Sequence, residues 1–87
     1  MWVALEKFNG DAPITKRSDI GQLVTLAHTL DKCIEGTKVY WKNNLSIVKC
    51  EPLYEGRDDV WVMGIERRGI RRNAIDWYVL LEHEVYG

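Results

Sequence analysis

Hydrophobic and polar residues follow two patterns along the chain, and the first of them predicts a helix. Within SDIGQLVTLAHTLDKCIEG, apolar residues recur at positions 20, 23, 24, 27, 30 and 34. Intervals of three and four residues put side chains on one stripe of an α-helix. Ser18 or Asp19 can cap the first turn, and Gly36 can take the left-handed conformation that ends a helix. We therefore expect a helix at about 19–35.

A period of two residues, typical of strands, dominates the rest of the chain. Residues 2–8 (WVALEKF) are rich in strand-forming types and are followed by the turn residues NGDAP. In residues 37–51, apolar and polar positions alternate around Asn43-Asn44, which predicts a two-residue hairpin turn between two antiparallel strands. Residues 60–66 (VWVMGIE) are a nearly continuous apolar run, as expected for a central strand covered on both sides.

The last segment fits two structures. Residues 75–85 have an apolar side chain at every second position from 75 to 81, which predicts a strand, but Asn73 before them can cap a short helix. We adopt the strand and keep the helix as the alternative. The order of elements then predicts an α+β fold, with one helix on one face of a mostly antiparallel sheet of four to five strands. The length suits a single domain that spans residues 1–87.

Charge and composition narrow the classes of partner. Twelve basic and thirteen acidic side chains give a formal net charge of −1, so the molecule as a whole does not attract polyanions or anionic membranes over long range. No signal-peptide pattern opens the chain, and no eighteen apolar residues occur in succession. Cys33 and Cys50 match no zinc or redox spacing and are expected to be unpaired. We expect a cytoplasmic protein that makes no membrane contact.

Residues suited to catalysis or metal binding are few. His28 falls at the polar edge of the predicted helix, and His83 stands between Glu82 and Glu84. In a strand His83 points to the face opposite both glutamates, so these three residues do not form a metal site. We expect no metal, no cofactor and no catalytic residue. A small enzyme whose site is assembled only by the fold is the third functional hypothesis.

The densest charge pattern is RRGIRR, which holds four of the six arginines of the chain. If residues 60–66 and 75–85 are neighbouring strands, these arginines lie in the hairpin loop between them and project from one end of the sheet. Guanidinium groups offer paired donors in a planar fork that suits phosphate or carboxylate. A solvated loop, neutralised in part by Glu66 and Asp76, is the alternative interpretation.

The leading hypothesis is a small non-enzymatic module that binds another protein. Tryptophan, tyrosine and arginine are frequent interface anchors. A module of this size suits an inhibitor or accessory subunit, including one encoded by a virus or mobile element. The alternative is a nucleic-acid-binding protein that uses the loop Arg67–Arg72 and stacks bases on Trp77 or Tyr78. We also expect a homodimer through the uncovered sheet face or an edge strand. The expected contact residues are Arg67, Arg68, Arg71, Arg72, Trp77 and Tyr78.

Overall fold

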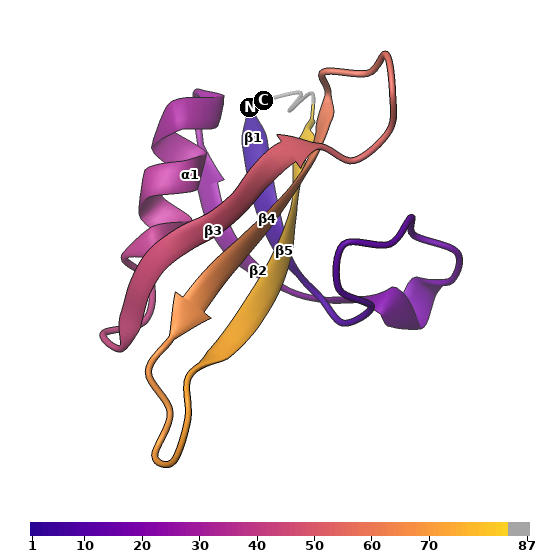
Figure 1. Cartoon of the computed structure of the whole chain (residues 1–87). Coiled ribbons are helices and arrows are strands. Elements are labelled where there is room, and N and C mark those ends of the chain that lie inside the picture. The colour runs from indigo at the N-terminus through magenta and orange to yellow at the C-terminus, as the bar shows by residue number, and fades with distance from the viewer. Residues whose placement is uncertain (84–87) are drawn as a thin grey trace.

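In the computed structural model, which describes residues 1–83, five antiparallel strands form one sheet and one α-helix packs on one of its faces (Figure 1). The strands lie in the order β2-β1-β5-β4-β3. This arrangement confirms the predicted α+β class. The elements in chain order are β1 (Trp2–Lys7), the 3-10 turn η1 (Arg17–Asp19), β2 (Ile20–Ala27), α1 (Leu30–Lys38), β3 (Asn44–Pro52), β4 (Val60–Arg67) and β5 (Ala74–Glu82).

The helix starts later than the sequence pattern predicts. Residues 20–27, expected to form its first half, are strand β2, and only Leu30–Lys38 are helical. The predicted bounds of 19–35 are therefore wrong. The pairing of β2 with β1 contains two register shifts, and at one of them the adjacent residues Val24 and Thr25 both face α1. Because such shifts break the strict alternation of a strand, the apolar residues of β2 recur at helix-like intervals.

The ends of α1 also differ from the expected ones. The Thr29 hydroxyl accepts a hydrogen bond from the Lys32 N–H at 3.2 Å and caps the first turn. Gly36 lies inside the helix instead of ending it. A Cβ atom at Gly36 would lie 2.8 Å from the Thr25 methyl group, so glycine lets α1 approach β2 closely. The role of Gly36 is therefore a close approach of two elements.

The predicted hairpin turn at Asn43-Asn44 is absent. The helix continues to Lys38, and residues 39–43 form the turn that leads into β3. Asn44 Nδ2 donates to the Lys38 carbonyl oxygen at 2.9 Å, which satisfies a carbonyl at the end of the helix. The strand expected before Asn43 is consequently wrong, while the strand expected after Asn44 is present as β3.

The remaining strands agree with the sequence pattern. β1 and β4 lie where the apolar runs 2–8 and 60–66 predicted them, and β5 occupies Ala74–Glu82. The helical alternative for the last segment is therefore wrong. Residues 84 and 85 of the predicted last strand lie outside the described residues. Within residues 1–83, no helix is long and apolar enough to cross a membrane.

Both faces of the sheet are partly covered. Between α1 and the sheet lies a buried cluster made of Ala4, Cys33, Met63, Ile65, Tyr78 and Leu80. On the side away from α1 lie the loops 8–19 and 53–59 (Figure 1), and Val62 and Val79 are buried there. The Ile14 N–H donates to the Tyr54 hydroxyl at 3.3 Å and joins the two loops. Loops thus cover part of the face that the sequence analysis expected to be uncovered.

Candidate functional site

The β4–β5 hairpin carries the four predicted arginines at one end of the molecule (Figure 1). Arg67 is the last residue of β4, while Arg68, Arg71 and Arg72 are exposed in the loop. A Cβ atom at Gly69 would clash with the Arg72 carbonyl oxygen. Glycine at this position therefore permits the tight path of the loop, which presents three arginines to solvent.

The other predicted contact residues are less available. Arg67 Nε donates to Asp76 Oδ2 at 2.8 Å, so this guanidinium already has a carboxylate partner. Tyr78 is buried in the core, and burial is the main cause that raises the pKa of its hydroxyl. Trp77 is half-buried and lies against Gly64, where a Cβ atom would come within 2.8 Å of its ring. Because Tyr78 is only 2% exposed, it presents an edge of its ring to solvent and no open face for stacking.

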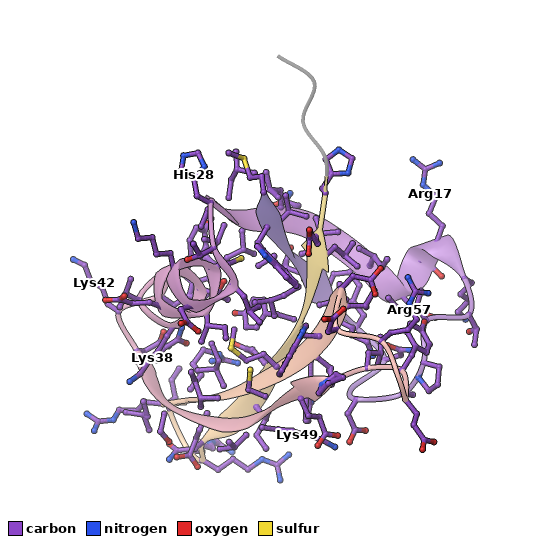
Figure 2. All side chains as sticks on the ribbon, turned by 90° about the horizontal axis from the view of Figure 1, so that it is seen from above. Arg17, His28, Lys38, Lys42, Lys49 and Arg57 are labelled. Atoms are coloured by element: carbon purple, nitrogen blue, oxygen red, sulfur yellow. The ribbon has the colours of Figure 1, made fainter. Side chains whose placement is uncertain are left out.

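Two hydrogen bonds bring the turn 39–43 next to the hairpin. The Arg68 N–H donates to the Asn43 carbonyl oxygen at 2.9 Å, and Asn43 Nδ2 donates to the Arg68 carbonyl oxygen at 3.1 Å. Lys38 and Lys42, on either side of the turn, thus join the hairpin arginines at the same end of the molecule. Figure 2 shows these two lysines on the side of α1, away from Arg17 and Arg57.

Exposed apolar side chains gather at this end as well. Ile70, at the tip of the hairpin, has a relative exposure of 104%, and Val39 in the neighbouring turn has 69%. Tyr40, Trp41 and Ile75 are about half exposed. None of the five cations at this end (Lys38, Lys42, Arg68, Arg71 and Arg72) forms an ion pair with an acidic residue within residues 1–83. We call the following set the hairpin end: Val39, Tyr40, Trp41, Ile70 and Ile75 with the cations Lys38, Lys42, Arg68, Arg71 and Arg72.

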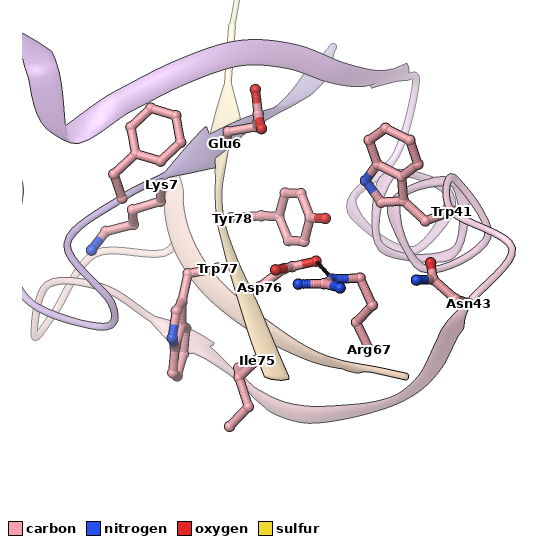
Figure 3. A pocket seen from close by; sticks show the side chains of 10 residues that line it. Glu6, Lys7, Trp41, Asn43, Arg67, Ile75, Asp76, Trp77 and Tyr78 are labelled. Atoms are coloured by element: carbon pink, nitrogen blue, oxygen red, sulfur yellow. Dashed lines mark hydrogen bonds and ion pairs between the residues drawn. The ribbon is translucent and has the colours of Figure 1, made fainter. Parts of the chain in front are cut away.

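A groove of about 550 Å³ opens beside the hairpin end (Figure 3). In Figure 3, Trp41 from the turn faces Tyr78 from β5, and the Arg67–Asp76 ion pair lies next to them. The groove therefore has aromatic side chains in its walls and the Arg67–Asp76 ion pair beside them. Its lining residues are Glu6, Lys7, Phe8, Trp41, Asn43, Arg67, Ile75, Asp76, Trp77 and Tyr78.

The turn residues at the hairpin end were missed by the sequence analysis. Val39 and Trp41 were interpreted as one face of a strand, which would have buried them. The signal that marks them is an apolar triplet enclosed by Lys38 and Lys42 directly after a helix. Comparisons with protein-family models, with curated proteins and with solved structures find no match to this chain.

Proposed function

We propose that the protein is a small non-enzymatic interaction module that binds another protein through its hairpin end. The observation that carries this proposal is the full exposure of Ile70 between two pairs of arginines, beside an exposed aromatic turn. Scattered surface hydrophobics are normal, but a group of five at one end of a small domain is typical of a binding surface. Aromatic and arginine side chains are the most frequent energetic anchors of protein interfaces.

The charges of the hairpin end favour an acidic partner. The hairpin end carries five positive charges, whereas the whole chain has a formal net charge of −1. The rest of the chain therefore has a formal charge of −6. Guanidinium groups bind carboxylates in paired hydrogen bonds. An acidic partner is attracted to the hairpin end and repelled by the remainder, which orients the encounter. The expected partner surface therefore has an apolar pocket for Ile70, with carboxylates around it.

An inhibitor or accessory subunit is the kind of module that we propose, including one encoded by a virus or mobile element. We further propose that it acts in the cytoplasm, since Cys33 and Cys50 are unpaired and such thiols persist in reducing compartments. Burial raises the pKa of Cys33 to about 11, which keeps it a thiol. A homodimer is proposed as well, because Leu23 and Leu26 are exposed on β2, and sedimentation of the parent protein tests it.

Nucleic-acid binding is the second candidate. It is favoured by Trp41, whose half-exposed ring lies at the same end of the molecule as the five cations and is available to stack on a base. The small size of the cationic group and the net negative charge of the chain favour the protein partner.

Copurification with the tagged protein in its native host tests the proposal. We expect a variant with Arg68, Arg71 and Arg72 changed to Ser and Ile70→Ser to lose the partner. Its fold should persist, because substitutions of exposed residues usually change stability by less than about 0.5 kcal/mol. The matched control is Arg17→Ser, an exposed arginine on another side of the molecule (Figure 2).

The outcomes separate the two candidates. Recovery of a protein that resists nuclease treatment and is lost only from the hairpin variant supports the interaction module. Recovery of nucleic acid alone supports the second candidate. If the hairpin variant and Arg17→Ser retain the same partners as the parent protein, the hairpin end is not the binding surface.

A further inference from the structure

The two outer strands of the sheet are irregular, whereas β5 is regular. The pairing of β2 with β1 has two register shifts, and so does the pairing of β3 with β4. β5 pairs with β4 from Leu81 to Ala74 without a shift. Bulges bend an exposed strand and protect its edge from pairing with further strands. The regular backbone of β5 is therefore a better template for an added strand than either outer edge.

β5 has an open edge of its own beside the hairpin end. β1 pairs with β5 only as far as Lys7, which lies opposite Trp77, and the chain then turns away into the loop 8–19. Ala74–Asp76, the first residues of β5, pair with β4 on one side. On the other side they pair with no strand of residues 1–83. Unpaired main-chain groups on a regular edge are the groups that an added strand uses.

The groove lies at this open edge and has a wall on each face of the sheet. In Figure 3, the half-exposed Trp41 stands above the buried Tyr78 on one side of β5, and Trp77 and Ile75 stand on the other. Successive residues of an extended segment point to opposite faces. Alternate side chains of a segment in the groove would therefore meet one aromatic wall and then the other. Such walls favour apolar and aromatic side chains.

We infer that the groove binds an extended segment of the protein partner as an added strand along Ala74–Asp76. This strand would continue the position of β1 in the sheet, beyond the point where β1 ends at Lys7. This inference rests on the proposed function and names the form in which the partner binds. One end of such a segment runs toward Arg71 and Arg72, which precede β5. Because these arginines are positively charged, we expect acidic residues at that end of the segment. Along the groove walls we expect apolar residues at alternate positions of the segment.

The probe is a peptide selected on the whole protein from a random library of ten-residue peptides. We expect the selected peptides to combine alternating apolar residues with acidic residues at one end. In an antiparallel pair only every second residue of a strand bonds to a given neighbour, so one set of alternate backbone nitrogens of the peptide faces β5 and the other set is the control. Methylation of the set that faces β5 removes main-chain donors and keeps every side chain. It should weaken binding about tenfold or more, because several main-chain hydrogen bonds are lost together.

Two protein variants locate the peptide. Trp41→Ala removes part of one groove wall and should weaken peptide binding about tenfold. The matched control is Val48→Ala, which changes a residue of similar exposure on β3 that does not line the groove, and it should leave peptide binding unchanged. In the peptide complex, those backbone amides of residues 74–76 that point away from β4 should exchange their hydrogens more slowly than in the unbound protein.

Several results would overturn the added strand. They are a library that yields no binder, a peptide that tolerates methylation of both alternate sets of backbone nitrogens, and a peptide that protects amides elsewhere. If, in the absence of peptide, hydrogen exchange at Ala74–Asp76 slows as the protein concentration rises, the open edge of β5 pairs with a second copy of this chain. The proposed function fails separately, when the hairpin variant keeps the copurified partner. If the hairpin variant loses the partner, but the partner does not protect residues 74–76 of the parent protein, the proposed function stands and the added strand is wrong.

Discussion

At the scale of single residues, Lys7 fixes the loop that covers the second face of the sheet. The residue is 3% exposed. Its Nζ donates to Asn9 Oδ1 at 2.5 Å and to the carbonyl oxygens of Gly10 and Ala12 at 2.6 and 2.5 Å. An ammonium group has three donors, and all are used. Loss of hydration is the main cause that lowers the pKa of Lys7. The sequence did not predict this residue, because its acceptors come from the conformation of the loop.

Replacing Lys7 with methionine should therefore destabilise the protein by about 1–3 kcal/mol, since it leaves the acceptors of the loop without their donor. Urea denaturation followed by tryptophan fluorescence measures the change. The matched control is Lys16→Met in the same loop, where the side chain is exposed and little change is expected. Equal midpoints for the two variants would show that the bonds of Lys7 contribute nothing to stability.

At the scale of elements, strand β2 shows where a sequence pattern fails. The apolar positions of Ile20–Ala27 fit a helical stripe, although Val24 and Thr25 are β-branched types that favour strands. A bulge is decided by pairing with β1 and by packing under α1, and neither is visible in a single segment. By contrast, β4 was predicted because a long apolar run of strand length needs no periodicity to be recognised.

Two substitutions distinguish the observed helix from the predicted one. Thr29→Ala removes the hydroxyl that caps α1 and should cost about 1 kcal/mol of the free energy of unfolding. Ser18→Ala would cost as much if the helix began at residue 19, but Ser18 is exposed in η1 and the expected change is within about 0.5 kcal/mol. Thermal unfolding by circular dichroism measures both, and a larger loss for Ser18→Ala would contradict the observed helix start.

The candidate site was predicted only in part for the same reason. The arginine hairpin follows from two strands on either side of RRGIRR, and both strands have patterns that the fold preserves. The turn 39–43 depends on where α1 ends, and that end is set by Asn44 and by the contact of Gly36 with β2. The exposed side chains of Val39 and Trp41 could therefore be recognised only after the helix had been placed.

At the scale of the whole molecule, charge is divided between the two ends of the sheet. The hairpin end holds five cations without an ion pair in residues 1–83. The loop 53–59 lies at the opposite end of the sheet (Figure 1) and contains Glu55, Asp58 and Asp59 with one cation, Arg57. A molecule with this asymmetry has a field that turns an acidic partner toward the hairpin end before contact.

The rate of association should report this steering. With the copurified protein partner at low ionic strength, a variant with Arg68, Arg71 and Arg72 changed to Ser should associate about tenfold more slowly than the parent protein. The difference should shrink as salt is added, because the screening length falls from about 10 Å at 0.1 M to about 3 Å at 1 M. Arg17→Ser should keep the parent rate at every salt concentration.

A nucleic-acid partner would give a different dependence on salt. Loss of three phosphate contacts would flatten the slope of log affinity against log salt concentration by about 2.7, because each contact releases condensed counterions. A protein partner has no such linear relation, and its affinity should change less regularly with salt. If the triple variant and the parent associate at the same rate in low salt, the arginines do not steer the encounter. Binding would then have to depend on the exposed apolar side chains of Ile70 and the turn 39–43.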